Sequence, residues 1–496
     1  MFRYIYLLLF TCSLANIGFS KALFHNDTTK KHSASAFVEM GGIITPQTQT
    51  PFWLRVNKNG TVPSDSPLGF VNLEANWIRN GKIRWIGQIS TSVVQNKNSS
   101  IYIPNLHIDA EYKGLVFRVG RFREIIGLGD SSMSSGFYIY SGNALPIPKI
   151  QLSTNGFLPL HFTNGFLSIH AQIGHGWFGH ETWAQNYYLH QKSFYLKFGK
   201  PRSSIHLYTG ISHFAQWGGN SAILIGSGRV APNGDLPHSL KDFLYVISAQ
   251  KFPQSTGLSS FDTENRVGNH LGTLEALFEY QNLRSTWLAY YQHPIENMPG
   301  VFGNFPDGLY GISWRNKSPK TSKLAVTNFI IEYLTTLDQG LFYNSIINTY
   351  HGNDYFNNSQ YMDGWTYRNH IIGTPFITYR NDTRPEWVNL RGSYEEGGYM
   401  KINSNSVTAL HVSSQVSFGK KNTILFRVSP SRHYFNLRND GSYEKNVNQF
   451  SSLLEFQNQP QKHKDIVLKM ALSFDDGELL PNTFGASFSF RKYISK

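Results

Sequence analysis

The feature that most restricts the fold is an export signal followed by no second long apolar stretch. Residues 5–14 form a short apolar core behind the basic residue Arg3, and small residues near Gly18 and Ser20 offer a cleavage site. This pattern predicts a signal peptide over residues 1–20. No later stretch approaches the ~20 apolar residues that a spanning helix needs. An exported chain of this kind is expected to be soluble or a β-barrel.

The single cysteine, Cys12, lies inside the predicted signal and leaves open an alternative cleavage as a lipoprotein. We favour cleavage near Ser20, because Phe10 and Thr11 do not give the small residues that lipoprotein processing uses. The mature chain then has no cysteine and no disulfide. Loss of Arg3 lowers the formal charge from +13 to +12. Residues 21–36 are predicted to be a polar lead-in and residues 37–496 a single domain, since no linker divides them.

Alternation of apolar and polar residues predicts strands along the whole chain. In residues 274–281, for example, Leu274 and Phe278 fall on one face, and Glu275 and Glu279 fall on the other. Further segments alternate in the same way: residues 193–200, 408–418, 466–474 and 484–494. A soluble sandwich shows the same alternation. Export, the lack of cysteines and the spread of these strands favour an all-β, transmembrane antiparallel β-barrel of the outer membrane.

One stretch, residues 352–379, is dense in aromatic and amide side chains and has no helical period. Two interpretations are open for it. The aromatics can pack a long ordered loop, which composition alone favours. They can also form a sugar-binding surface, since flat rings with amides between them suit a polyhydroxylated ligand.

Several blocks resemble the capsule assembly Wzi family. The run DYFNNSQYMDGWTYRNHIIGTPF (354–376) is similar to that family's central block. The resemblance extends over roughly residues 37–496 through these further blocks: TPFWLRVNKNG (50–60), NALPIPKIQLS (143–153), HGWFGHE (175–181), NHLGTLEALFEY (269–280), YYQHPIENMPG (290–300), FPDGLYGISW (305–314) and IIEYLTTLDQG (330–340).

The resemblance implies an outer-membrane barrel of a Gram-negative bacterium with about 18 strands, whose lumen is closed by loops or short helices. It implies non-covalent binding of capsular polysaccharide at the extracellular face, with lipopolysaccharide and the barrel assembly machinery as further partners. Candidate polysaccharide-binding residues are Trp365, Tyr367, Tyr361, Trp183 and Asn357. The Pro-rich residues 143–160 are expected to fold inward as a plug, and residues 228–237 to form a loop.

Three arginines, Arg118, Arg121 and Arg123, lie close together in sequence. Strand alternation places Arg118 on the opposite face from the other two. The favoured interpretation is a salt-bridge network in the lumen with glutamates such as Glu275 and Glu279. The alternative is a basic lumen or rim that attracts anions, which the positive charge of the chain also fits. The sequence has no run of basic residues that would indicate binding to nucleic acid.

Catalytic motifs are absent from the sequence, so no enzyme and no cofactor are expected. His170, His175 and His180 are five residues apart, which reverses the strand face each time, and the nearby glycines predict a loop at 174–179. A metal site is therefore not expected. Two other functions stay open: a diffusion channel for a small solute, and an enzyme acting on lipid or glycan. The last strand, 484–494, carries Tyr493 inside its end instead of a terminal aromatic residue, which leaves its register open.

Overall fold

The computed structural model describes residues 31–251, 259, 261–262, 266–297, 300–317, 324–340, 353–388, 400–419, 421–437, 443–460 and 463–495. The predicted signal peptide and residues 21–30 of the predicted lead-in lie outside this range. Strand β1 begins at His32. Residues 32–36 therefore belong to the barrel wall, and the predicted lead-in ends earlier than residue 36.

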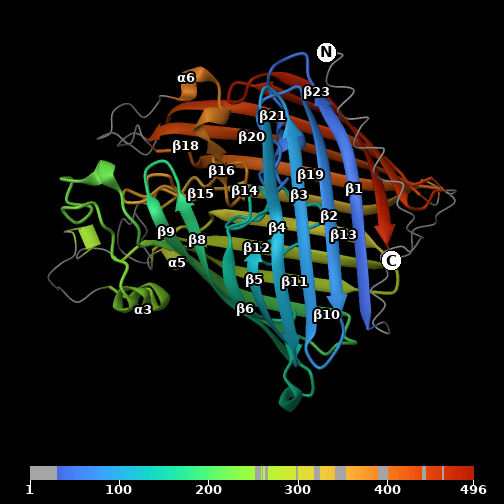
Figure 1. Ribbon diagram of the computed structural model, residues 1–496, viewed down its shortest axis with the longest axis horizontal. Coiled ribbons are helices and arrows are strands. Elements are labelled where there is room, and N and C mark those ends of the chain that lie inside the picture. The colour runs from blue at the N-terminus through green and yellow to red at the C-terminus, as the bar shows by residue number, and fades with distance from the viewer. Residues whose placement is uncertain are drawn as a thin grey trace.

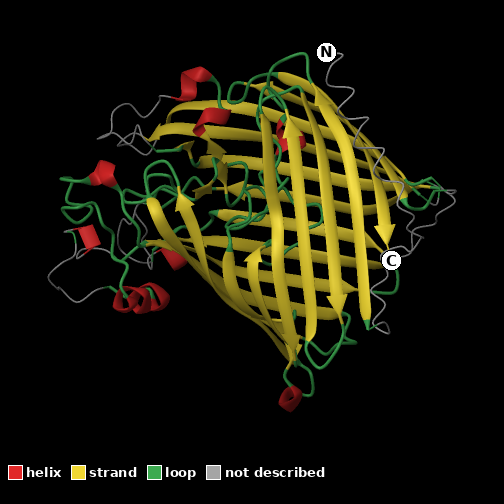
Figure 2. Ribbon diagram, in the orientation of Figure 1, coloured by secondary structure: helices red, strands yellow, loops and turns green. Residues whose placement is uncertain are grey.

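The described residues form a closed antiparallel β-barrel (Figures 1 and 2). They form a sheet of 19 strands. Strands β6 and β7 both pair with β8 and occupy a single strand position in the wall, so the barrel is 18-stranded. The wall closes where β1 pairs with β23. Its strands are β1 (His32–Ile44), β2 (Leu68–Arg79), β3 (Arg84–Gln95), β4 (Ser99–Tyr112), β5 (Leu115–Arg121), β6 (Lys149–Thr154), β7 (Leu158–Pro159), β8 (Leu167–His180), β9 (Gln185–Phe198), β10 (Ile205–Trp217), β11 (Asn269–Gln281), β12 (Ser285–Ile295), β13 (Gly308–Asn316), β14 (Ala325–Thr335), β19 (Ser406–Phe418), β20 (Asn422–Leu437), β21 (Tyr443–Asn458), β22 (Ile466–Gly477) and β23 (Thr483–Ser495).

Alternation along each strand separates an apolar outer face from a polar inner face, as predicted. In β11, Leu274 and Phe278 are exposed on the outside, whereas Glu275 is buried in the lumen. In β19, Leu410 is exposed outside and His411 is buried inside. This is the reverse of a soluble protein, and it is the arrangement that lipid outside and polar groups inside require.

The two ends of the barrel differ in the length of their connections. At one end the strands are joined by short turns, such as Lys113 and Gly114 between β4 and β5, both with positive φ. At the other end, long connections cover residues 45–67, 122–148, 218–268 and 336–405. Outer-membrane barrels place short turns in the periplasm and long loops outside the cell. We call the long-loop end the outer end.

Described parts of these connections pack together at the outer end in a hydrophobic core, which we call the plug (Figure 2). It includes Trp53, Tyr138, Phe356, Trp365 and Ile402, all almost fully buried. The small elements that carry it are α2 (Phe52–Arg55), β15 (Thr366–Tyr367), β16 (His370–Ile371), β17 (Thr378–Tyr379), η4 (Arg380–Asp382), α6 (Pro385–Val388) and β18 (Ile402–Ser404).

Helices are few and short in the described part of the chain. The longest, α3 (Leu240–Ser248), starts at a capping box formed by Ser239 and Asp242. The others are α5 (Gly300–Gly303), η2 (His161–Thr163) and η3 (Ala222–Leu224). Among the described helices, none is long and apolar enough to cross a membrane.

Two local predictions need correction, and one open question is settled. Of residues 143–160, only the first part enters the plug, with Leu145 and Ile147 buried; Lys149–Thr154 is wall strand β6. Residues 174–179 are strand, since β8 runs to His180 with irregular register near Gly179. Residues 122–148 and residues 353–388 supply many of the side chains in the plug. The last strand has a defined register, with Tyr493 opposite Phe37.

Candidate functional site

The aromatic block predicted as a sugar-binding surface is the centre of the plug. Trp365 is completely buried and donates its indole N–H to the carbonyl of Ile139 at 2.7 Å. Its ring packs edge-to-face against Phe214 and Phe178. The ring faces of Trp365 are therefore covered by protein, and the prediction that it stacks on a sugar is wrong. The packed-loop interpretation is correct for this residue.

Three of the other predicted binding residues are also covered. Tyr361 is buried against Tyr187 and donates its hydroxyl to the carbonyl of Gly218. Tyr367 is buried against Phe178, with its hydroxyl accepting from Arg121. Asn357 donates its amide to Asp354. These side chains hold the plug together and present no open surface for a glycan.

Trp183 lies in the short β8–β9 connection and is partly buried against the plug. The connection is fixed by Asp363, whose carboxylate accepts the backbone N–H groups of Thr182, Trp183 and Ala184 at 2.9–3.1 Å. Asp363 also forms an ion pair with Lys401 at 2.8 Å. Through these contacts Asp363 ties this rim loop firmly to the plug.

Two of the three arginines, Arg118 and Arg123, reach the lumen, where their partners differ from those predicted. Arg118 donates to both carboxylate oxygens of Asp109 at 2.6 Å. Arg123 donates to Glu74 at 2.9 Å and to Ser90 at 2.7 Å. Glu275 and Glu279 bind tyrosine hydroxyls instead, those of Tyr195 and Tyr208. The salt bridges predicted for the lumen are therefore present for Arg118 and Arg123, but the named partners Glu275 and Glu279 were wrong.

The predicted face of Arg123 was wrong because the strand does not continue regularly. Gly120 has a φ of +129°, and a Cβ there would lie 2.1 Å from the carbonyl oxygen of Leu106. Only glycine accepts this backbone without strain. Strand β5 ends one residue later, at Arg121. The change of direction turns the chain inward, so Arg118 and Arg123 both reach the lumen.

A cleft of about 880 Å³ lies at the outer end beside Arg121, and we call it the outer cleft. The end of β5 and the plug hairpin β15–β16 meet there, through the hydrogen bond of 3.2 Å from Arg121 Nη2 to Tyr367 Oη. Polar groups that line the cleft are Arg55, Arg121, Arg368, Asn369, His370, Tyr379, Asn381 and Asp382. Arg55 and Asp382 neutralise each other in an ion pair.

Two guanidinium groups reach the cleft, that of Arg121 and that of Arg368, which forms an ion pair with Glu181. Within the described residues, Arg121 forms no ion pair; its contacts are the Tyr367 ring and hydroxyl and the Ile103 carbonyl. Arg368 lies 3.9 Å from Glu181, and its side chain is 58% exposed. Burial lowers the pKa of His370, so this imidazole is neutral near pH 7. Two guanidiniums with amides and a phenol can bind carboxylate or phosphate together with sugar hydroxyls.

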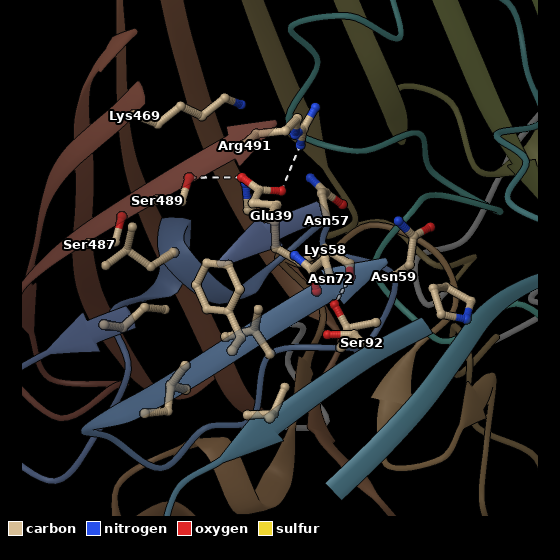
Figure 3. Close-up of a pocket in the computed structure, with 18 of the residues that line it drawn as sticks. Glu39, Asn57, Lys58, Asn59, Asn72, Ser92, Lys469, Ser487, Ser489 and Arg491 are labelled. Atoms are coloured by element: carbon tan, nitrogen blue, oxygen red, sulfur yellow. Dashed lines mark hydrogen bonds and ion pairs between the residues drawn. The ribbon is translucent and has the colours of Figure 1, made fainter. Parts of the chain in front are cut away.

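A second, smaller space of about 270 Å³, the inner cavity, lies inside the lumen beneath residues 57–59 (Figure 3). Glu39 accepts from Arg491 at 2.7 Å and from Ser489 at 2.8 Å, so these charges satisfy each other. Lys58 also lines this cavity, and burial lowers the pKa of its amine. Wall strands and plug residues line this space, which is about a third of the volume of the outer cleft.

The histidines singled out in the sequence do not come together. His170 faces the lumen and contacts Thr154 at 2.8 Å, whereas His175 packs outside against Trp177, Tyr188 and Phe243. His180 ends β8 and is exposed. Among the described residues, no group of three or more His, Cys, Asp or Glu has the arrangement to hold a metal ion.

Sequence reasoning missed Arg368, Asn369, Tyr379 and Asn381 as members of the site. The available signal was the polar tripeptide Arg368-Asn369-His370 between Tyr367 and Ile371, which marks the tip of the β15–β16 hairpin. Arg368 and Asn369 both have positive φ, as a tight hairpin turn requires. Pairing this tip with Arg121 needs the fold, because 246 positions in sequence separate Arg121 from Tyr367.

The closed wall, apolar outer face and filled outer end define an outer-membrane β-barrel with a plug. No family model and no curated protein matches the chain. Among solved structures, it is similar to Wzi, an outer-membrane protein involved in group 1 capsule assembly in Escherichia coli and described as a carbohydrate-binding β-barrel. The TM-score is 0.56 at 13% identity, covering 92% of this chain and 83% of that one.

Other outer-membrane barrels are similar as well. Pseudomonas aeruginosa OccK5 aligns with a TM-score of 0.45 at 8% identity, over 94% of this chain and 98% of that one. Acinetobacter baumannii OccAB2 aligns with a TM-score of 0.45 at 9% identity, over 96% and 100%. At 13% identity, the likeness to Wzi supports the fold alone. Membership of the Wzi family stays a prediction from the sequence blocks.

Proposed function

We propose that this protein binds an acidic surface polysaccharide at the outer cleft, without turning it over, and so holds capsule at the surface of a Gram-negative cell. The observation that carries the proposal is a solvent-accessible cleft at the outer end that offers Arg121 and Arg368 beside amide and phenol groups. Guanidinium groups bind carboxylates or phosphates through two parallel hydrogen bonds. Amides and phenols suit the hydroxyls of a sugar ring.

The plug supports a binding role over a transport role. Long connections from several parts of the chain form one hydrophobic core inside the outer end. A diffusion channel needs a continuous aqueous path through the barrel, whereas this core is packed with aromatic and aliphatic side chains. The likeness to a carbohydrate-binding barrel in fold, and the sequence blocks that resemble the Wzi family, agree with the same role.

Polymer binding does not need a strong single contact. A capsular polysaccharide repeats the same unit many times and engages many copies of a surface protein together. Effective concentration then raises retention by orders of magnitude above the affinity of one cleft. A cleft with two available guanidiniums is therefore sufficient in principle for anchoring.

A deletion strain tests the role in the cell. Cells that lack the protein are expected to make normal amounts of capsular polysaccharide but to release it into the medium. Complementation with the wild-type chain should restore cell-bound capsule, and Arg121→Gln with Arg368→Gln should restore it poorly. Lys113→Gln, which removes a cation at the opposite end of the barrel, is the matched control and should complement fully. A normal cell-bound capsule in the deletion strain would refute the role.

A further inference from the structure

The barrel wall has a gap beside the outer cleft. Strand β4 pairs with β3 along its length, but its ladder with β5 covers only residues 106–112. Strand β8 pairs with β6 only up to Gly176. Strands β5 and β6 have 7 and 6 residues, against 14 in β4 and 14 in β8. Loop segments stand in the wall where these two strands end (Figures 1 and 2).

The β4 edge at this gap has the features of a protected free edge. Pro104 lies within it and has no N–H to leave unpaired. Arg121 reaches back from the end of β5 toward the carbonyl of Ile103 at 3.5 Å. An unpaired strand edge exposes backbone donors and acceptors and is normally blocked in these ways. The gap is therefore part of the fold of these residues and not a frayed end.

The mouth of the gap is apolar on its outer side. Ile101, Ile103 and Leu106 line the outer cleft and are also 69%, 38% and 52% exposed on the outer face of β4. Tyr112 ends the same strand at the other side of the membrane. A tilted strand needs about 9–11 residues to cross the hydrocarbon core. Because Tyr112 lies at the inner side, the mouth is about one hydrocarbon-core thickness away along β4, at the outer boundary of that core.

The outer cleft thus joins two environments. Its inner part offers Arg121, Arg368 and amide groups, and its mouth offers aliphatic side chains that face the outer leaflet. A ligand that satisfies both parts has an anionic sugar headgroup and an acyl chain. A free polysaccharide would use only the polar part.

We propose that the cleft takes its glycan sideways from the membrane, as an anionic glycolipid of the outer leaflet. The sugars and phosphates of the headgroup lie against Arg121 and Arg368, and one acyl chain lies along Ile101, Ile103 and Leu106. This inference rests on the proposed function, because it names the form in which the acidic glycan is bound.

The test compares one phosphorylated glycolipid with and without its acyl chains. The probes are a lipooligosaccharide and the same molecule after alkaline deacylation, which keeps its sugars and phosphates. Each is titrated against the full-length protein in detergent, with bound complexes counted by native mass spectrometry. The wild-type protein is expected to bind the intact form about tenfold more tightly, the ratio that burial of one large aliphatic group gives.

Two matched variants locate the effect on β4. Ile103→Asn changes the mouth, and Ile108→Asn makes the same change on the same outer face where β5 pairs with β4. Ile103→Asn should remove most of the preference for the acylated form, and Ile108→Asn should keep it. Arg121→Gln should weaken binding of both forms. A variant that fails to fold is expected to migrate at the same position on gels before and after heating. If Ile103→Asn fails in this way, Ile103→Ser replaces it.

Several results would overturn the sideways entry. If the wild-type protein binds the two forms with equal affinity, sideways entry is wrong. The proposed function then stays intact if binding still depends on Arg121. Equal effects of Ile103→Asn and Ile108→Asn would also overturn sideways entry. If neither form binds, the inference fails, and a titration with acidic polysaccharide decides the proposed function separately.

Discussion

The indole N–H of Trp365 donates to the carbonyl oxygen of Ile139 at 2.7 Å, which joins two inward segments 226 positions apart in sequence. Both residues are fully buried in the same core. This bond is one of the contacts that make separate connections into a single plug. The integrity of the plug therefore depends on an aromatic residue that the sequence alone offered as a ligand-binding candidate.

Substitution of Trp365 is expected to loosen the plug before it affects the wall. Trp365→Ala removes a buried indole, a change that costs about 3–5 kcal/mol in a core. Trp365→Phe keeps most of the volume but leaves the Ile139 carbonyl unpaired, at about 1–3 kcal/mol. Limited proteolysis should cut the long connections of both variants faster, with Trp365→Ala the more sensitive. Trp287→Phe, on the lipid-facing side of β12, should behave as wild type; equal protection of all three proteins would contradict this.

The wild-type barrel is expected to show no steady ion conductance in planar bilayers, because the plug core fills its outer end. Trp365→Ala should produce irregular openings, since loosened connections admit water and ions. The same preparations should migrate faster on gels before heating than after, which shows that the wall is closed. Regular channels of porin size in the wild-type protein would favour the diffusion-channel alternative.

A buried carboxyl group predicts that the plug weakens as pH rises. Asp307 accepts the backbone N–H groups of Asp338 and Gln339 and the hydroxyl of Tyr355, and burial raises the pKa of Asp307 from 3.8 to about 7. The folded state therefore binds a proton that the unfolded state releases between these values. The stabilisation is complete below about pH 3.8 and is lost as pH rises through about 7.

Hydrogen exchange measures this effect directly. After correction for intrinsic rates, peptides containing Gln339 and Tyr355 should exchange faster at pH 8 than at pH 6. Asp307→Asn keeps the acceptor oxygen and removes the titration, so its protection should not change between the two pH values. Slower exchange of the wild-type peptides at pH 8 would show that the sign is wrong.

The wall was predictable from the sequence because strand alternation is a local pattern. The faces of residues 274–281 and 408–418 follow directly from which side chains are apolar, and the structure places them accordingly. The predicted export, the lack of cysteines and the spread of these strands then favoured a membrane barrel over a sandwich. Trp365 and Tyr361 show where this reasoning ends: an aromatic residue in a long loop can face ligand or core, and composition is the same in both cases.

The site depended on contacts that no local pattern contains. Arg121 was found in sequence, but its neighbours at the cleft come from the hairpin around Arg368, which is distant from it in sequence. Strand alternation assumed a regular backbone, which placed Arg123 on the wrong face. Polar residues at the tip of a buried loop are the one signal that would have directed attention to Arg368 and Asn369.

Binding of a soluble acidic polysaccharide to the purified full-length protein tests the central claim most directly. Affinity should fall with added salt, which screens charges over about 8–10 Å. Arg121→Gln with Arg368→Gln should weaken binding about tenfold, as loss of charge-assisted hydrogen bonds predicts, and Lys113→Gln should bind as wild type. Absence of binding by the wild-type protein, or equal binding by the double variant, would contradict a polysaccharide site at the outer cleft.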